Sequence, residues 1–409
     1  MHVTGIIAEY NPFHNGHAYQ LRRIRELHPD TIIAVAMSGS IVQRGTPAVL
    51  DKWRRAELAI AGGCDLVCEL PFLFACRSAQ DFARGGVRLL AALGIDTLAF
   101  GAESDDLDAL SRIAAAIDAP ETQERTGYFL RAGKSYAQAL TAALQAAGLA
   151  KGNELHEANN ILAVEYLRAL RSTRIEPLLI LRRGAGYHAT KLQAMASATA
   201  IRQAMQEASP DWEALASALP QATYQALRSA FPQEIPSPDA LLQALRLRLL
   251  TMDEAAQSRQ YGLSAGEGLE NRLQKAAAHA ATTEDFLQGV ITSRYPRSRI
   301  RRLIPHLLLQ TPRDLVAAAD SQGPLYLRVL ACSERGRLLL RRTRRTGTLP
   351  LITKLSAVLH SGDRLHFRKL TPLQQQLAFD TWATELRTLS LPSLTGADDF
   401  TRSPSFWKS

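Results

Sequence analysis

Cysteine is scarce in this chain of 409 residues, and its spacing excludes two common uses. Cys64, Cys68, Cys76 and Cys332 form no Cys-x-x-Cys pair and no Cys/His arrangement of the zinc type. We therefore expect buried free thiols and no disulfide bonds.

Long apolar runs are absent as well. No segment approaches the roughly 18 to 20 consecutive apolar residues that span a bilayer. The chain begins directly in strand-like sequence, without the basic and apolar regions of a signal peptide. These absences predict a cytoplasmic protein with no membrane partner. The length is sufficient for two or three domains.

Lysine is missing from the stretch that carries the excess positive charge. Residues 294–345 hold thirteen arginines against three acidic residues, whereas the whole chain has a net charge of +9. The rest of the chain is therefore close to neutral. A solvated surface is one interpretation of such a stretch. Tyr295 and Tyr326 lie among the arginines, however, and guanidinium forks with aromatic rings favour nucleic-acid contact.

Strand and helix signals alternate over residues 1–102, which predicts a parallel sheet with helices between its strands. The expected strands are residues 3–9, 31–37, 64–70 and 95–100, and the expected helices are 17–27, 51–61 and 79–93. Residues 107–170 are mostly helical, and residues 176–181 are expected to add a strand. Asp51 is a plausible helix N-cap.

The fold class predicted from this pattern is α/β. We expect a Rossmann-like domain over residues 1–204 with a helical insertion at about 105–170, followed by a helical domain at 205–290. A basic region follows at 291–409, with short strands near 325–330 and 350–353 and helices at 333–345 and 370–389. The part after residue 204 is thus a largely helical α+β region.

Two histidines three residues apart, His14 and His17, lie where the first strand ends and a helix begins. The free N–H groups and the positive dipole end of a helix N-terminus form a seat for phosphate. Open parallel sheets bind their ligands at the carboxyl ends of strands, which is where this turn falls. The turn therefore predicts a nucleotide-phosphate site.

A second turn has the pattern Ser197-x-Thr199-x-x-Arg202 at another expected helix start. Hydroxyl and N–H groups can bind the outer phosphates of ATP, and the arginine fork can hold their charge. Alone, such a turn is usually only a helix cap. Paired with the upstream histidines, it is much more specific.

This pairing resembles the nucleotidylyltransferase superfamily of the HIGH type, and further segments look like the bacterial tRNA(Met) cytidine acetate ligase family. Those segments are residues 9–17, 38–45, 51–53, 69–71, 100–103, 159–166, 266–273, 293–295 and 299–302, so the likeness covers nearly the whole chain. Ala102, Ala158 and Pro296 depart from the usual family pattern.

The resemblance implies a two-step reaction. ATP and acetate form acetyl-adenylate, and the acetyl group then passes to N4 of the wobble cytidine of elongator tRNA(Met), giving N4-acetylcytidine. Attack on the α-phosphorus needs positive groups around phosphate, and the mixed anhydride makes an enzyme nucleophile unnecessary. Mg²⁺ is expected with ATP, no metal ligand is assigned, and no obligate protein partner is expected. Glu9 holding Mg²⁺ through water is a less favoured interpretation.

The resemblance also implies which residues act. His14 and His17 are the expected catalytic residues, stabilising the transition state at the α-phosphorus. The residues expected around ATP are Ile7, Ala8, Glu9, Tyr10, Asn11, Pro12, Phe13, His14, Asn15, Gly16, His17, Ala18, Tyr19, Gln20, Gly101, Asn160, Arg182, Arg183, Ser197, Thr199 and Arg202. Asn160 is favoured over Asn159, and Arg182 and Arg183 remain alternatives. The arginines expected to contact tRNA are Arg294, Arg297, Arg299, Arg301, Arg302, Arg341 and Arg342.

Two other functions compete with this one. A small-molecule adenylyltransferase would share both ATP turns but would leave the basic region unexplained. A non-catalytic RNA-binding protein with a degenerate nucleotide fold is disfavoured, because both turns are intact.

Overall fold

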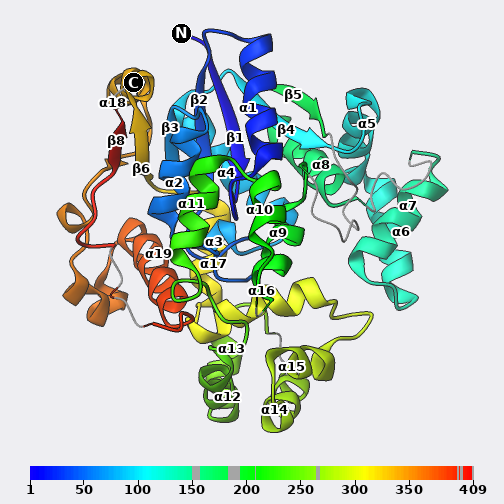
Figure 1. The fold of residues 1–409 in the computed structure, drawn as a ribbon. Coiled ribbons are helices and arrows are strands. Elements are labelled where there is room, and N and C mark those ends of the chain that lie inside the picture. The colour runs from blue at the N-terminus through cyan, green and yellow to red at the C-terminus, as the bar shows by residue number, and fades with distance from the viewer. Residues whose placement is uncertain are drawn as a thin grey trace.

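The structure is a computed structural model that describes residues 1–149, 157–182, 194–207, 209–263, 268–393, 396 and 399–407. Figure 1 shows a central sheet with helices on both faces and further helices beyond one end of its strands. The strands in the described residues are β1 (Val3–Ala8), β2 (Ile32–Ser38), β3 (Leu66–Leu70), β4 (Thr97–Ala102), β5 (Glu176–Leu181), β6 (Leu327–Ser333), β7 (Leu351–Ile352) and β8 (Ser405–Trp407).

Helices make up most of the remaining described chain. They are α1 (Asn15–Leu27), α2 (Lys52–Ala61), α3 (Phe72–Ala75), α4 (Ala79–Leu93), α5 (Leu107–Ile117), α6 (Pro120–Arg131), α7 (Tyr136–Ala146), α8 (Ala158–Leu170), α9 (Ala198–Met205), α10 (Trp212–Ala218), α11 (Gln221–Ala230), α12 (Leu242–Leu250), α13 (Glu254–Arg259), α14 (Leu269–His279), α15 (Thr283–Val290), α16 (Arg297–Leu308), α17 (Arg313–Gln322), α18 (Glu334–Thr346) and α19 (Pro372–Thr388). Two short 3-10 helices, Leu355–Ala357 and Ser361–Lys369, precede α19.

The first five strands form the parallel part of the sheet. The strand order is β5-β4-β1-β2-β3-β6-β7, with β8 beside β6. β1 pairs with β2 from Val3 opposite Ile32 to Ala8 opposite Met37. Every residue of β2 and β3 is buried, as expected for strands covered by helices on both faces. The predicted α/β fold with a parallel sheet is confirmed, including the strand at 176–181.

Local sequence sets the start and end of the helices that flank this sheet. The Asp51 carboxylate accepts the N–H of Arg54 at 2.9 Å and caps α2, as predicted. Ser78 caps α4 in the same way. Gly94 ends α4 with a φ of +73°, a left-handed conformation that favours glycine.

The carboxy-terminal part of the chain contributes to the same sheet. β6 lies antiparallel to β3, with Leu66 opposite Cys332, and β7 and β8 both lie beside β6. The sequence analysis set residues 291–409 apart as a basic region, whereas in the structure its strands complete the sheet of the first domain. Pairing between strands so distant in the sequence leaves no local signal in either strand.

The apolar core is divided in a way that also differs from the expected helical domain at 205–290. One cluster covers the sheet face that packs on α4 and α8, and a second covers the face that packs on α1, α2 and α9–α11. A third cluster lies among α12, α14, α15 and α16. Helices α10 and α11 therefore belong to the sheet domain, and α12–α15 share their core with α16.

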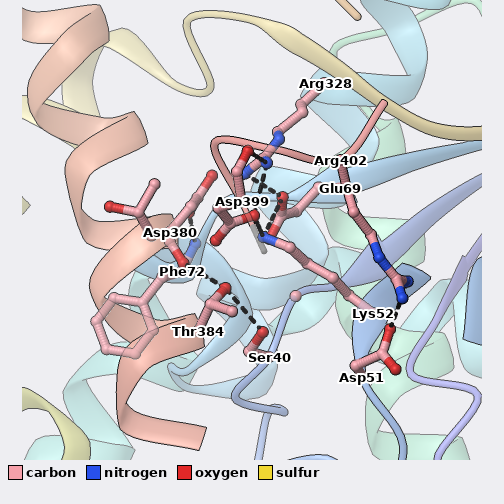
Figure 2. A network of polar contacts seen from close by, with 12 residues as sticks. Ser40, Asp51, Lys52, Glu69, Phe72, Arg328, Asp380, Thr384, Asp399 and Arg402 are labelled. Atoms are coloured by element: carbon pink, nitrogen blue, oxygen red, sulfur yellow. Dashed lines mark hydrogen bonds and ion pairs between the residues drawn. The ribbon is translucent and has the colours of Figure 1, made fainter. Parts of the chain in front are cut away.

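Four charged side chains form a buried network where α2, β3 and β6 meet the carboxy-terminal segment (Figure 2). The Lys52 ammonium lies 2.8 Å from Glu69 and 2.7 Å from Asp399. Arg328 reaches the same two carboxylates at 3.1 and 2.6 Å. Burial alone would raise the pKa of Asp399, but Arg328 and Lys52 outweigh this effect and lower it to about 2.

The cysteines are buried free thiols, as predicted, and burial raises the pKa of Cys64 to about 12. Thiols in this environment are protonated at neutral pH and pack as small apolar groups. Within the ranges described above, no helix combines the length and apolar character needed to cross a membrane.

Lys52→Met is expected to lower the free energy of unfolding by about 3–5 kcal/mol, because it leaves two buried carboxylates with a single cation. Chemical denaturation measures this change. The exposed Lys354 offers a matched control, and Lys354→Met is expected to change the stability by less than about 0.5 kcal/mol. Equal effects of the two substitutions would contradict a structural role for the network.

Candidate functional site

A cavity of about 670 Å³ lies at the carboxyl ends of β1, β2, β4 and β5. Of the residues predicted around ATP, the cavity is lined by Ile7, Ala8, Glu9, Tyr10, Asn11, His14, Gly16, His17, Tyr19, Gln20, Gly101, Arg182, Ser197, Thr199 and Arg202. Pro12, Phe13, Asn15, Ala18 and Asn160 are not among its lining residues. Arg183 lies outside the described residues. Both predicted turns therefore meet in one cavity.

The histidine turn caps α1 through its own imidazoles. His14 is the N-cap, and its Nδ1 accepts the N–H of Gly16 at 3.0 Å. The Nδ1 of His17 accepts the N–H of His14 at 3.2 Å, and the two rings stack with centroids 3.8 Å apart. Because both Nδ1 atoms accept hydrogen bonds, the proton of each neutral ring is on Nε2. Each Nε2–H is then left to donate to a ligand.

Both imidazoles are neutral at neutral pH. Burial is the main cause that lowers the pKa of His14 to about 3, and Arg182 and Arg202 lower it further. Burial, His14 and Arg182 hold the pKa of His17 well below its usual value. Near the histidine turn, the permanent positive charge therefore comes from Arg182 and Arg202, and the neutral histidines can act as hydrogen-bond donors.

The second turn is fixed against the first. The Ser197 hydroxyl caps α9 by accepting the N–H of Ala200 at 3.2 Å. Arg202 donates from Nη1 to the carbonyl of Asn11 at 2.6 Å and from Nη2 to Thr199 Oγ1 at 3.2 Å. This arginine therefore links the helix start of α9 to the end of β1.

Asn15 makes the corresponding link from α1. Its amide donates to the carbonyls of Ala194 and Ser217, at 3.0 and 2.9 Å. The side chain thus holds the segment before α9 and the end of α10 against the histidine turn. This positioning role explains why Asn15 does not line the cavity itself.

A third group fixes the loop after β4. The Asn160 side chain is buried and accepts the N–H groups of Glu103 and Ser104, both at 3.0 Å. The Glu103 carboxylate in turn accepts the N–H of Asn160 at 3.0 Å and lies 3.7 Å from Arg182. Asn159 lines the cavity, whereas Asn160 lies behind it. The geometry thus favours Asn159 over the predicted Asn160 for contact with a nucleotide.

Sequence reasoning missed the residue that holds the cavity floor. Arg55 is completely buried in α2 and donates to the carbonyls of Glu9 at 2.6 Å, Ser38 at 3.0 Å and Leu50 at 3.1 Å. Its guanidinium also contacts the Gly39 carbonyl. An arginine within an amphipathic helix is ordinarily expected at the surface, so nothing in the local pattern indicated this role.

The backbone is strained at the same place. Tyr10 has a φ of +46°, which is rare for a bulky residue and is concentrated at functional sites. Its neighbour Asn11 is buried, and the Asn11 Oδ1 accepts the N–H of Val49 at 2.8 Å. The end of β1 is therefore held in one conformation from both sides.

The opposite wall of the cavity was only partly predicted. It is formed by the loop after β2, the start of α4, α8 and α16, including Gln43, Arg44, Ser78, Tyr166, Ser298 and Arg302. Arg302 was predicted to contact tRNA, and the structure places it inside this wall. Burial lowers the pKa of its guanidinium.

The arginines predicted for tRNA do not form one surface. Arg297 of α16 pairs with Glu284 through both Nη atoms at 2.6 Å. Arg294 and Arg299 lie over the ring of Tyr295, at 5.7 and 5.0 Å from its centroid. Arg301 also lies on α16.

Helix α18 carries the second group of predicted arginines. Arg342 donates to the carbonyls of Leu93 and Gly94, which precede β4, and Arg341 on the same helix is exposed. These contacts place α18 at the amino-terminal ends of the parallel strands, whereas α16 lies beyond their carboxyl ends (Figure 1). The two groups are close in sequence and lie at opposite ends of the sheet.

Comparison with known proteins agrees with this geometry. The model of the HIGH Nucleotidyl Transferase family matches residues 1–399, so the chain is a HIGH nucleotidyltransferase. The chain is 39% identical over 420 residues to the tRNA(Met) cytidine acetate ligase of Syntrophotalea carbinolica, a match that covers 99% of this chain and 98% of that protein. This chain therefore belongs to the tRNA(Met) cytidine acetate ligase family.

Solved structures give the same result. Two crystal structures of Thermotoga maritima TmcAL are similar over the full length of both chains, each with 32% sequence identity. The apo form has a TM-score of 0.90, and the form bound with alpha-thio ATP has a TM-score of 0.88.

His14→Asn is expected to reduce the loss of stability between about pH 7 and about pH 5. The folded pKa of His14 is lowered from 6.5 to about 3, so below pH 6.5 the unfolded chain binds a proton that the folded chain excludes. Acid therefore favours unfolding, by about 2 kcal/mol at about pH 5 for this group. Asparagine keeps an acceptor for the Gly16 N–H but does not titrate.

Chemical denaturation of the wild type and the variant at both pH values provides the measurement. His279→Asn, at an exposed position, is the control and is expected to leave the pH dependence as it is. An acid-induced loss that is the same in wild type and His14→Asn would show that His14 titrates normally in the folded protein.

Proposed function

We propose that this protein activates acetate with ATP, forming acetyl-adenylate and pyrophosphate, and transfers the acetyl group to N4 of the wobble cytidine of elongator tRNA(Met). Membership of the family supports the reaction class. One observation assigns the reaction to this cavity: the histidine turn and the Ser197–Arg202 turn, which are both predicted to bind ATP, line it together. The rival functions considered from the sequence remain as outcomes of the test below.

The proposed binding mode of ATP follows from the hydrogen-bond donors of the two turns. The phosphates of ATP lie at the start of α1, where His14 and His17 line the cavity and each keeps an Nε2–H that the turn itself does not use. Arg202, with Ser197 and Thr199, bounds the phosphates from α9. These donors would stabilise the negative charge that develops when acetate attacks the α-phosphorus.

The nucleoside is proposed to lie along the ends of β4 and β5. Gly101 lines this part of the cavity, and a Cβ there would meet the Arg182 side chain at 3.2 Å. Asn159 lines the cavity from the start of α8, with its amide nitrogen donating to the Glu103 carboxylate. Glycine at 101 therefore leaves space for a ligand where a side chain would crowd it.

Mg²⁺ is proposed to enter with ATP. Among the described residues, no group of three or more His, Cys, Asp or Glu side chains is placed to hold a metal ion. An ion held mainly by phosphate oxygens and water fits the preference of Mg²⁺ for few protein ligands. Bound there, it would neutralise phosphate charge.

We place the tRNA at the α16 side of the cavity, because Ser298 and Arg302 of that helix line it. The wobble base is in a single-stranded loop and can leave its stack to enter a pocket. A tRNA substrate places the reaction in the cytoplasm.

His17→Asn is expected to reduce acetate-dependent exchange of pyrophosphate into ATP by about 100-fold, because it removes one preorganised donor to the phosphates. Asparagine keeps an acceptor for the His14 N–H, so the turn is preserved. His279→Asn serves as the control. The same proteins are incubated with ATP, labelled acetate and total tRNA, and N4-acetylcytidine is measured after digestion.

The result separates the candidate functions. Wild-type protein that labels a small molecule but not tRNA would be a small-molecule adenylyltransferase, and absence of any ATP turnover would indicate a non-catalytic RNA-binding protein. Undiminished exchange in His17→Asn would exclude the proposed role of that histidine.

The double variant Arg294→Gln/Arg299→Gln is expected to weaken tRNA binding and to reduce the salt slope by about 0.7 for each phosphate that the protein no longer neutralises. Pyrophosphate exchange is expected to continue, since neither residue lines the cavity. Arg341→Gln/Arg344→Gln on α18 removes the same charge at the other end of the sheet and is expected to have the smaller effect. Titration of labelled tRNA at several salt concentrations provides the comparison, and a larger effect at α18 would place the tRNA there.

A further inference from the structure

One carboxylate in the cavity has an unused oxygen. Glu9 directly follows β1, and its Oε1 accepts the N–H of Gln43 at 3.0 Å. Within the described residues, Glu9 makes no other hydrogen bond or ion pair through its side chain. The Oε2 atom is thus available to a ligand that carries a donor.

A tyrosine that lines the same cavity has a buried ring and a hydroxyl without a hydrogen-bond partner among the described residues. Tyr166 is 5% exposed, and its ring packs against Phe100 with centroids 5.7 Å apart. Its hydroxyl makes no hydrogen bond in the described part of the chain, although it lines the cavity. The hydroxyl oxygen is not enclosed by protein, so it can donate to a ligand in the cavity that accepts a hydrogen bond.

The two groups lie near each other and on the same side of the sheet. Burial raises the pKa of the Tyr166 phenol, and the Glu9 carboxylate raises it further, so the hydroxyl stays a neutral donor beside a negative charge. Ile7 and Tyr166 belong to the core cluster on the α4 and α8 face. No hydrogen bond joins Glu9 to Tyr166 within the described ranges, so the carboxylate and the hydroxyl can each bond a ligand in the cavity that both residues line.

The Glu9 and Tyr166 side chains lie apart from the histidine turn, where the phosphates of ATP are proposed to bind. His17 contacts the rings of Tyr10 and Phe13, which belong to the cluster on the opposite face of the sheet. Arg302 of α16 lies on the side of Tyr166, because its carbonyl faces the Cys76 thiol at 3.7 Å and Cys76 is part of the same cluster as Tyr166. The unpaired groups therefore lie between the strand ends and the helix proposed to face tRNA.

We propose that Glu9 and Tyr166 form the subsite for the acceptor cytosine. The free Oε2 of Glu9 accepts a hydrogen bond from the N4 amine, and the Tyr166 hydroxyl donates to N3. Along the edge of cytosine, the N4 amine is a donor and N3 is an acceptor, so Glu9 and Tyr166 are complementary to them. A carboxylate is a suitable partner for the N4 amine. Uridine reverses the order, because it presents a carbonyl oxygen at position 4. The inference rests on the proposed function and assigns its second substrate.

The same contact gives Glu9 a part in the chemistry. N4 attacks the carbonyl carbon of acetyl-adenylate and forms the new C–N bond. The bond from that carbon to the phosphate oxygen breaks, and AMP leaves with the electron pair. The N4 proton passes to the Glu9 carboxylate. Because the lone pair of this amine is delocalised into the ring, removal of the proton by a positioned base favours the transfer.

Adenine presents the same order of donor and acceptor, so the test must separate the two bases. Formation of the adenylate uses ATP alone, and transfer uses the cytidine. The variants are Glu9→Gln, which keeps an oxygen for the Gln43 N–H, and Tyr166→Phe, which keeps the ring. Glu176→Gln is the control, because Glu176 is exposed at the start of β5 and does not line the cavity.

Two rates are measured on each protein: acetate-dependent pyrophosphate exchange without tRNA, and single-turnover acetyl transfer to tRNA. For Glu9→Gln, transfer is expected to fall by about 100-fold or more, and the ratio of the transfer rate to the exchange rate is expected to fall by at least about tenfold. Tyr166→Phe is expected to slow transfer by about tenfold, equivalent to the removal of one hydrogen bond. Glu176→Gln is expected to resemble wild type in both rates.

Competitive binding of RNA tests directly whether Glu9 and Tyr166 distinguish cytidine from uridine. Anticodon stem-loops with cytidine or uridine at the wobble position compete for the protein. Glu9→Gln is expected to improve binding of the uridine form relative to the cytidine form by about tenfold, since the amide can donate to the uridine oxygen.

Other outcomes overturn the proposal in distinguishable ways. If Glu9→Gln raises the KM for ATP or slows exchange and transfer in parallel, the pair serves the nucleotide and not cytosine. Wild-type transfer in both variants would leave the two groups without a role in the acceptor site. A wild-type protein without either half-reaction would overturn the proposed function, and this subsite with it.

Discussion

The buried network of Lys52, Glu69, Arg328 and Asp399 is the constraint on which the site depends. It joins the start of α2 to β3, to β6 and to the carboxy-terminal segment. One turn further along α2, Arg55 holds the carbonyls at the ends of β1 and β2. The position of the cavity floor therefore follows from the position of α2, which buried charges fix. Buried ion pairs contribute little net stability but resist the loss of one partner, so they restrict how the helix can be placed.

The charged and neutral side chains of the histidine turn and its neighbouring arginines suit an anionic ligand. The buried imidazoles of His14 and His17 are neutral, so the site avoids two desolvated cations beside Arg182 and Arg202. Their Nε2–H groups can still donate to a ligand in the cavity that both residues line. A polyanion would pair with the arginines and favour proton uptake by the imidazoles, since an opposite charge stabilises the protonated form. Binding and protonation are thus coupled at this turn.

Much of the fold and part of the site were predictable from the sequence, and the reasons differ. The parallel strands are continuous apolar runs followed by capped helices, so β1–β5 and the cap at Asp51 were predicted correctly. The antiparallel pairing of β6 with β3 depends on contacts far apart in the sequence and was not. Among the site residues, those within short turns, such as His14 and Arg202, carry a local signal. Arg55 and Tyr166 act through their position in three dimensions, and their helices show only ordinary amphipathic patterns.

The arginine-rich stretch shows why charge along the sequence is an incomplete guide to a binding surface. Arg328 lies in the core network, Arg297 is held by Glu284, and Arg342 binds carbonyls that precede β4. These three positive charges are used by the fold itself. Only the helix α16 brings part of the stretch to the cavity, through Arg302. Some arginines of the stretch thus stabilise the fold, and others lie near the cavity. Acetyl transfer is proposed at the carboxyl ends of the strands, so the arginines near those ends are the ones expected to contact RNA.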